Sequence, residues 1–356
     1  MKKKTNYRVI LVDREQRLLR HRVSAINTLT TSLWKTIGIW KNMDLSPYEH
    51  VRVWDHCGAS LGFDAEYSEN EPLGWVVQDQ QVHDALLLTL HNSSTVRLLL
   101  GEDGVEILQD TEQVHLKTQE TFIHGRYLIA CDGSCSWVRE HLSFPLMQWS
   151  YEHTAITAHV ILEKSHCQTA WQNFTQHGPL AFLPLSDTHQ ASIVWSTSPE
   201  YATALYALDE DAFIKELLFA SEGRFGKILR IGPRYTFPLM MRHVNQYVKD
   251  RVILCGDAAH TVHPLAGQGL NLAMHDIVEL LDAFVLIEKN HHHRRFLRYY
   301  ERSRKTANWE MIALLECIKR LYEVKCPETK VLINKAVVCL DSSRVIKSLI
   351  KKWITT

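Results

Sequence analysis

The chain has 356 residues, of which 46% are hydrophobic and 22% are charged, so a soluble protein with a folded core is expected. Its 40 Lys and Arg balance its 40 Asp and Glu, which gives no reason to expect nucleic-acid binding. The eight cysteines form no C-x-x-C pair and follow no secretory signal, as in a cytoplasmic protein with reduced thiols. No apolar run is long enough to predict a membrane-spanning helix.

The first predicted strand raises a question about how the chain begins. Residues 9–12 form a continuous apolar run, typical of a strand buried on both faces, and the run ends in Asp13. In a dinucleotide-binding fold such an acid follows the second strand and binds a ribose, and a first strand with a G-x-G-x-x-G turn comes earlier. No set of glycines here has that spacing, since only Gly267 and Gly269 are one residue apart and Leu272 follows them.

Further elements are predicted from hydrophobic periodicity and turn residues. The first part of the chain is predicted to contain a helix over 24–37, strands within 50–64, a strand and a helix within 73–90, and a strand meander over 95–133 that ends in a second buried strand. Mostly strands follow over 151–238, with one helix at 209–220. The last part contains a strand and turn over 250–260, a long helix from about Leu270 to 288, and further helices to the end of the chain.

The most informative stretch is VILCGDAAHTVHPLAGQGLNLAMHD, residues 252–276. A buried strand ends at Gly256, and Asp257 follows at its carboxyl end, where α/β folds place ligand groups. A glycine-rich turn then precedes a helix whose positive N-terminal end faces whatever lies against the turn. The stretch predicts a site for an anionic or electron-rich planar ligand. A strand–loop–helix connection without a ligand is the alternative.

Residues 252–276 resemble the flavin-contacting motif of class A aromatic hydroxylases, and are nearest to the ubiquinone-biosynthesis branch, the UbiH, UbiF, VisC and Coq6-like FAD-dependent monooxygenases. Other segments resemble the family in the same order along nearly the whole chain. They are RVSAI at 22–26, YLIACDGSCSWVR at 127–139 as the D-G motif, WQNFTQHGPLAFLPL at 171–185 as substrate-domain strands, and YERSRKTAN at 300–308 as the C-terminal helix.

The resemblance implies an α/β fold: an FAD-binding Rossmann-like domain lacking its first strand and G-x-G-x-x-G turn, an inserted mixed or antiparallel β-sheet substrate domain, and C-terminal helices. The expected divisions are 1–150 and 239–290 for FAD binding, 151–238 for substrate, and 291–356 for the helical region. The beginning of the chain fits either an internal Met of a longer gene or a decayed remnant, and the intact flavin motif favours the former. Without the glycine turn, these 356 residues are expected to hold FAD weakly or not at all.

The resemblance also assigns residue roles. Asp13 would bind the adenosine ribose, and Arg22 would pair with an FAD phosphate. Asp132 and Gly133 would shape the turn at the pyrophosphate, with Arg139 steadying that loop. The flavin itself would be held by Gly256, Asp257 at the ribityl chain, His263, Pro264, Ala266, Gly267, Gln268, Gly269, Leu270 and Asn271. A surface cap, a solvent-exposed arginine, a plain turn and a structural histidine are the respective alternatives for Asp13, Arg22, the D-G turn and His263. No metal ligand and no catalytic side chain are assigned.

The implied activity is hydroxylation of a prenylated phenol or benzoquinol ring in ubiquinone biosynthesis. NADH or NADPH would reduce FAD, and a flavin C4a-hydroperoxide formed with O2 would deliver the hydroxyl group. The substrate would lie against the sheet of 151–238, with residues 178–185 as one wall. Two alternatives stay open. One is a class A hydroxylase of a soluble aromatic, and the other is a non-catalytic remnant that acts as a partner in the ubiquinone-synthesis assembly.

The C-terminal region is basic, with 15 Lys and Arg against 6 Asp and Glu from Arg294 onward. Its last residues, SSRVIKSLIKKWITT, place apolar side chains near one helical face and lysines around the other. This pattern predicts either peripheral contact with an anionic surface, at the inner face of the membrane, or a helix whose apolar face packs on the FAD-binding part.

Overall fold

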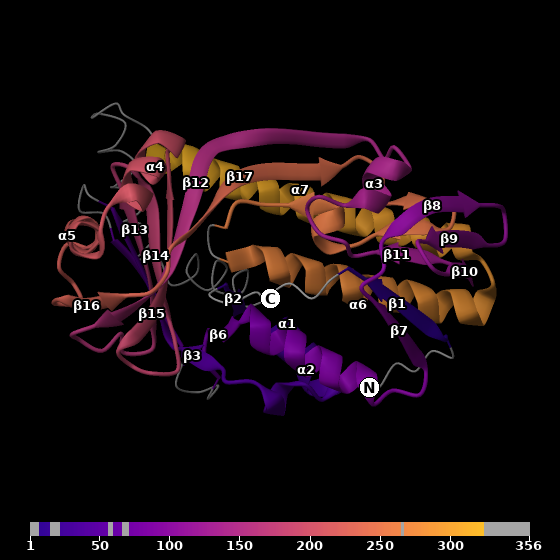
Figure 1. Ribbon diagram of the computed structural model, residues 1–356, viewed down its shortest axis with the longest axis horizontal. Coiled ribbons are helices and arrows are strands. Elements are labelled where there is room, and N and C mark those ends of the chain that lie inside the picture. The colour runs from indigo at the N-terminus through magenta and orange to yellow at the C-terminus, as the bar shows by residue number, and fades with distance from the viewer. Residues whose placement is uncertain (1–6, 15–21, 56–59, 66–70, 265–266, 324–356) are drawn as a thin grey trace.

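The computed structural model describes residues 7–14, 22–55, 60–65, 71–264 and 267–323. A large sheet lies at one end of the molecule, and two small parallel strand pairs lie toward the other end (Figure 1). The strands β12 (Leu146–Leu162) and β17 (Tyr235–Val244) run out from the large sheet and join these two parts.

The large sheet has nine strands, and its continuous order is β20-β17-β12-β15-β14-β13-β4-β5, with β16 also paired to β12. Every neighbouring pair is antiparallel except β13 and β4, which are parallel. The remaining strands are β4 (His50–Asp55), β5 (Ser60–Asp64), β13 (Thr169–Thr175), β14 (Gly178–Pro184), β15 (Gln190–Thr197), β16 (Ile228–Ile231) and β20 (His260–Thr261). Residues 50–64, expected in the FAD-binding part, thus join the sheet that otherwise begins at Leu146.

Two helices cover one face of this sheet, α4 (Pro199–Ala207) and α5 (Glu210–Ala220). The core between them and the sheet contains Leu180, Phe182, Trp195 and Phe213, each no more than 1% exposed. Because side chains alternate along a strand, Ala181 and Leu183 of β14 lie on the opposite face, toward the rest of the molecule.

The second part is built around two parallel strand pairs. β1 (Val9–Asp13) pairs with β7 (Val96–Leu100), and β11 (Leu128–Ala130) pairs with β19 (Val252–Leu254), whose other edge takes β18 (Val248–Lys249). This part also contains two three-stranded antiparallel sheets. They are β2 (Val23–Ile26), β6 (Gly74–Gln78) and β3 (Ser46–Tyr48), and the meander β8 (Gly104–Gln109), β9 (Val114–Thr118) and β10 (Phe122–Gly125).

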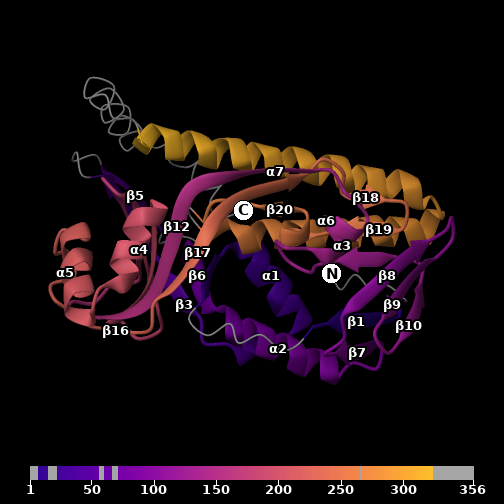
Figure 2. The same cartoon turned by 45° about the horizontal axis from the view of Figure 1, so that its top comes forward.

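The helices of this part are α1 (Thr28–Ile37), α2 (Asp79–His91), α3 (Trp137–His141), α6 (Gln268–Asn290) and α7 (His293–Glu323), with the short 3-10 turns η1 (Trp40–Asn42) and η2 (Gly256–Ala258). α6 and α7 pack on β19, which is fully buried. α7 then continues to the large sheet, where Ile312 and Leu315 share a core with Met241 (Figure 2). A helix long and apolar enough to cross a bilayer does not occur in the described part of the chain.

Four expectations from the sequence are wrong in detail. Val9 is 49% exposed and Ile129 is 43% exposed, so neither β1 nor β11 is buried on both faces. Among the described residues, β1 pairs with one strand, β7, and Val12 is the one residue of β1 that packs against a hydrophobic core. The helix expected over 24–37 is strand β2 followed by α1, because the Asn27 side chain accepts a hydrogen bond from Thr30 N and fixes the helix start.

The fourth correction is the helix α4. It was not expected, although Ser198 caps it and Pro199 occupies its first turn, a combination that favours a helix start. The long helix predicted from near Leu270 is confirmed as α6. It begins at Gln268, directly after Gly267, which adopts the left-handed conformation. The amphipathic tail of residues 342–356 lies outside the described residues.

Candidate functional site

Two glycines shape the strand–loop–helix connection between β19 and α6. Gly256 has φ 62°, and a Cβ there would lie 3.2 Å from the Cβ of Ala273. Gly267 has φ 63°, and a Cβ there would lie 2.9 Å from the Cβ of Ala25 in β2. Both positions combine a left-handed backbone with a close approach, so larger residues would be strained. The loop is thereby pressed against β2 on one side and α6 on the other.

A buried carboxylate, Asp276, holds this connection together. It is fully buried on α6, and its Oδ2 accepts hydrogen bonds from the Gly256 amide at 3.0 Å and from His260 Nε2 at 2.7 Å. Its Oδ1 pairs with Arg304 Nε of α7 at 2.7 Å. The same carboxylate therefore fixes the start of the loop, β20 and the C-terminal helix.

The chemistry of this cluster keeps Asp276 ionised. Burial opposes ionisation, but the charge and hydrogen bonds of His260 and Arg304 lower the pKa of Asp276 to about 2. Asn308 extends the network, since it accepts from Arg304 Nη2 at 3.0 Å and donates to the Tyr247 hydroxyl at 2.9 Å. No role was predicted from the sequence for Asp276, Arg304 or Asn308.

Asn271 ties the first turn of α6 to β2 and α1. Its Oδ1 accepts hydrogen bonds from Asn27 N at 3.1 Å and Thr30 Oγ1 at 2.9 Å, and its Nδ2 donates to Ala25 O at 3.1 Å. Asn271 was expected at the flavin. Its side-chain contacts here are with the protein, so its clearest role is to position the helix start.

The D-G loop lies beside the same connection. Arg139 is buried and donates from Nη1 to Ala258 O at 3.0 Å and from Nη2 to Ser134 O at 2.9 Å, which joins the two loops. Burial lowers the pKa of Arg139. Asp132 accepts a hydrogen bond from Val138 N at 3.1 Å and so orders the start of α3. The expected steadying role of Arg139 is confirmed.

Asp79, an acid with no role predicted from the sequence, pairs with Arg22 and lies near the charge of Asp257. Arg22 Nε pairs with Asp79 Oδ2 at 2.9 Å, and Ser24 Oγ donates to Asp79 Oδ1 at 2.7 Å. Burial raises the pKa of Asp79, and the nearby charge of Asp257 contributes to that rise. Asp257 is half-buried, and its carboxylate forms no hydrogen bond with the part of the chain that the structure describes.

His263 lies where the loop meets the large sheet. It is buried, its ring is 4.8 Å from that of Tyr151 and 6.1 Å from that of His153, and Lys319 Nζ of α7 donates to Tyr151 O at 3.0 Å. β12 carries a register shift between Ser150 and Thr154, so this bulge directs Tyr151 and His153 to the loop. Burial lowers the pKa of His263 to about 3 and that of His153 to about 4, so both rings are neutral at pH 7.

The residues around the loop fit an FAD group. Gly267, the N-cap of the 23-residue helix α6, has no side chain to cap it, so the helix start can receive an anionic or electron-rich ligand. Among the described residues, no atom lies within 4 Å of a Cβ placed at Gly269 or Gly133, so both backbones face space that these residues leave open. Asp257, in η2 between β19 and α6, supplies a half-buried acceptor for ligand hydroxyls.

The remaining residues that were predicted to bind the cofactor have the following surroundings. Asp13 is exposed at the end of β1, where its backbone carbonyl accepts from Gly101 N at 2.9 Å, and the structure gives it no contact with the loop residues. Pro264 accepts from Gly267 N at 3.0 Å and so closes the turn. Gln268 is buried, and Leu270 packs on the core around Trp34. Ala266 lies outside the described residues.

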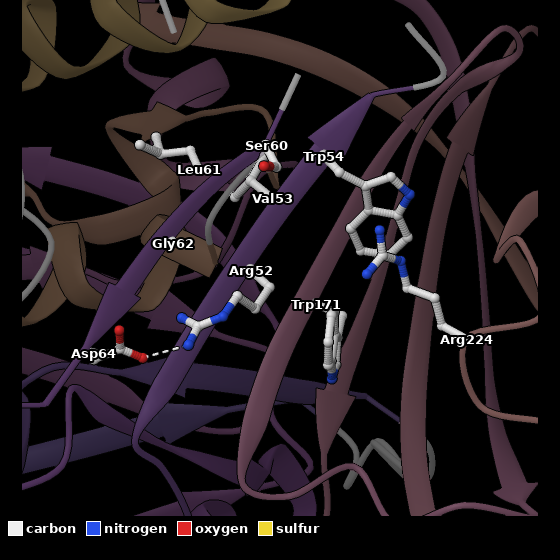
Figure 3. Close-up of a pocket in the computed structure, with 9 residues that line it drawn as sticks. All are labelled: Arg52, Val53, Trp54, Ser60, Leu61, Gly62, Asp64, Trp171 and Arg224. Atoms are coloured by element: carbon white, nitrogen blue, oxygen red, sulfur yellow. Dashed lines mark hydrogen bonds and ion pairs between the residues drawn. The ribbon is translucent and has the colours of Figure 1, made fainter. Parts of the chain in front are cut away.

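A separate pocket of about 460 Å³ lies at the β4–β5 edge of the large sheet (Figure 3). Arg224 stacks over Trp54 at 4.1 Å from the ring centroid, and Arg52 Nη2 pairs with Asp64 at 2.5 Å. None of the residues assigned to the flavin lines this pocket. This pocket is the alternative location for a bound cofactor, and an experiment can distinguish it from the loop between β19 and α6.

Comparison with solved structures identifies the fold. The chain superposes on p-nitrophenol 4-monooxygenase PnpA from Pseudomonas putida DLL-E4 with a TM-score of 0.79 and 16% identity, covering 98% of this chain and 92% of that one. PqsL from Pseudomonas aeruginosa, a probable FAD-dependent monooxygenase, gives a TM-score of 0.76 and 20% identity, with 93% of each chain covered. The fold is that of FAD-dependent monooxygenases.

Sequence comparison defines the family more closely. Residues 5–314 match the FAD binding domain family. The chain is 31% identical to the mitochondrial ubiquinone biosynthesis monooxygenase COQ6 of Xenopus tropicalis, covering 86% of this chain and 76% of that protein. It is 30% identical to 3-demethoxyubiquinol 3-hydroxylase of Escherichia coli K12, covering 92% and 85% respectively. The chain belongs to the UbiH, UbiF, VisC and Coq6-like family of FAD-dependent monooxygenases.

Two glycine substitutions separate folding from cofactor binding. Gly267→Ala should lower the free energy of unfolding by about 1–3 kcal/mol, because it strains a left-handed residue against Ala25. Gly269→Ala should raise stability by about 0.5–1 kcal/mol, because alanine is the better helix residue and its Cβ meets no atom of the described residues. The same Gly269→Ala change should weaken FAD binding by filling the open space. Urea unfolding and FAD titration of both variants test this, and unchanged FAD binding in Gly269→Ala would place the cofactor elsewhere.

Proposed function

We propose that this protein uses FAD and NADH or NADPH to hydroxylate the ring of a prenylated phenol or quinol in ubiquinone biosynthesis. The observation that carries the proposal is the near full-length similarity to proteins named for that pathway, the frog COQ6 and the bacterial 3-demethoxyubiquinol 3-hydroxylase. The intact loop of residues 255–264, held by Asp276, supports the same reading.

The cofactor and the residues around it would each have a separate role. FAD, when bound, supplies the transfer of electrons from the nicotinamide to O2 and of one oxygen atom to the ring. Asp257 would accept hydrogen bonds from ribityl hydroxyls. The amides at the start of α6 would face the electron-rich edge of the flavin, where the helix dipole favours negative charge. Asp276 and Arg139 would hold these groups in place without touching the cofactor.

The substrate would lie between the loop and the large sheet. Ala181 and Leu183 of β14 face this side, whereas Leu180 and Phe182, from the same predicted wall, are buried under α4 and α5. His263 and His153 are neutral there, so they add polar rings without adding charge. A neutral, partly apolar wall suits a prenylated ring and helps to exclude water.

The test is a turnover assay with excess FAD and either NADH or NADPH, under ¹⁸O2. A short-chain prenylated phenol is compared with a soluble phenol of the same ring substitution. The expected result is gain of one ¹⁸O atom by the prenylated compound at a higher kcat/KM. Preference for the soluble phenol would indicate a hydroxylase of soluble aromatics. Absence of any labelled product would favour the non-catalytic role.

We further propose that residues 342–356 contact an anionic membrane surface in a protein that is otherwise cytoplasmic. The basic, amphipathic pattern motivates this, and each Lys or Arg near such a surface contributes about 1 kcal/mol. Co-sedimentation with anionic liposomes should fall on removal of residues from Ser342 onward, and should fall at high salt. If neither form binds liposomes while the shortened one loses thermal stability, the tail is part of the core.

A further inference from the structure

The two cofactor loops begin at neighbouring cysteines. Cys131 follows β11 and precedes Asp132, and Cys255 follows β19 and precedes Gly256. β11 and β19 are parallel, with Ala130 opposite Leu254, so one further step places the two cysteines side by side. The Cys255 amide donates to Ala130 O at 3.0 Å, which continues the pairing to this point.

The two thiols lie close enough for each to shift the pKa of the other. Side chains in register on adjacent parallel strands point to the same face, and adjacent strands lie about 4.8 Å apart. That spacing falls within the Cα separation of about 4.4–6.8 Å that a disulfide requires. A disulfide holds its two Cβ atoms about 3.5–4.5 Å apart, so a small approach of the two strand ends would allow a sulfur–sulfur bond to form.

The pair has an accessible member and a protected one. Cys131 is exposed and Cys255 is buried. The neighbouring Cys255 thiol lowers the pKa of Cys131, although the charges of Asp132 and Asp276 oppose that shift. The same partnership and burial raise the pKa of Cys255. Cys131 is thus the thiol that an oxidant would reach first, and Cys255 is placed to resolve the product.

We infer that Cys131 and Cys255 form an oxidation site, which hydrogen peroxide converts into a disulfide joining the two cofactor loops. The Cys131 thiolate attacks the peroxide, so that a sulfur–oxygen bond forms and the oxygen–oxygen bond breaks. The hydroxide that leaves takes up the proton that the thiol released, and the products are a sulfenic acid and water. Cys255 then attacks the Cys131 sulfur, forming the sulfur–sulfur bond and releasing a second water. Two thiols are oxidised, and one peroxide is reduced to two waters.

One part of the inference rests on the proposed cofactor site. Cys131 is exposed beside Asp132 and Gly133, so FAD bound over these loops would cover its sulfur. The disulfide should therefore form more slowly in the presence of FAD. Once formed, it would tie together two segments far apart in the sequence and raise the resistance of the protein to unfolding.

The experiment treats the full chain with hydrogen peroxide, blocks the remaining thiols with an alkylating agent, and identifies linked peptides by mass spectrometry. The expected result is a Cys131–Cys255 link that dithiothreitol reverses, with a higher Tm before reduction. Cys131→Ser, at an exposed position, should abolish the link, and Cys135→Ser, four residues along the same loop, should retain it. A Cys131–Cys135 link, or overoxidised Cys131 with no link, would overturn the inference.

Two further arms complete the test. The urea-unfolded chain should lose the preference for this pair, and equal linking there would overturn the structural basis of the site. Excess FAD should slow linking of the folded chain several-fold. If linking proceeds at the same rate with FAD under conditions in which titration shows FAD bound, the oxidation site stands and the proposed position of FAD is overturned.

Discussion

Asp276→Ala should lower the free energy of unfolding by about 3–5 kcal/mol, because it leaves a buried arginine and histidine without their carboxylate. Asp276 is fully buried and joins Gly256, His260 and Arg304 at 2.7–3.0 Å. Urea unfolding measures the change. Glu279→Ala is the matched control, since Glu279 lies on the same helix and forms no ion pair with residues that the structure describes; it should change stability by less than about 1 kcal/mol. Equal losses in both variants would show that the Asp276 network does not hold the loop.

The same residue predicts how stability depends on pH. The pKa of Asp276 falls from 3.8 to about 2 on folding, so its contribution is complete above pH 4 and is lost as the pH falls through about 2. The difference in unfolding free energy between the wild type and Asp276→Asn should therefore be constant from pH 7 to pH 5 and shrink below pH 4. A difference that grows on acidification would contradict this sign.

Asp257→Ala should weaken FAD binding by roughly 10- to 150-fold, which corresponds to the loss of a charge-assisted hydrogen bond of about 1.5–3 kcal/mol. The half-buried carboxylate of Asp257 bonds to no described residue, so its removal should leave the unfolding free energy nearly unchanged. Fluorescence titration with excess FAD measures the effect. Arg22→Ala should have a smaller effect on FAD, because Arg22 is exposed and already paired with Asp79. An unchanged Kd in Asp257→Ala would show that the flavin lies elsewhere.

Local patterns account for much of the fold. The apolar run of β19, the long helix α6 and the strand-rich middle of the chain follow from periodicity, and the structure contains all three. Periodicity fails where a single residue decides the outcome. Asn27 ends β2 and starts α1, so one apolar pattern covers two elements. The pairing of β4 with β13 joins residues more than 100 positions apart, which a local pattern does not encode.

In the candidate site too, some residues can be predicted from the local sequence and others cannot. Asp257 and the glycine turn are contiguous in sequence, so their chemistry can be read from it. Asp276, Arg304 and Asn308 act through contacts between two helices, and these depend on how α6 and α7 pack. One signal for Asp276 was available: the acid lies four residues from both Leu272 and Leu280, which are apolar and on the same face of the helix. Buried acids on such stripes are paired, which would have directed attention to the arginines of α7.

Hydrogen–deuterium exchange with and without saturating FAD tests the location of the cofactor most directly. We expect slower exchange at the amides of residues 256–259 and 267–271 and in the D-G loop of residues 132–134, with no change around the β4–β5 pocket. Protection of residues 52–64 and 224 without protection of the β19–α6 connection would place FAD in that pocket and contradict the account.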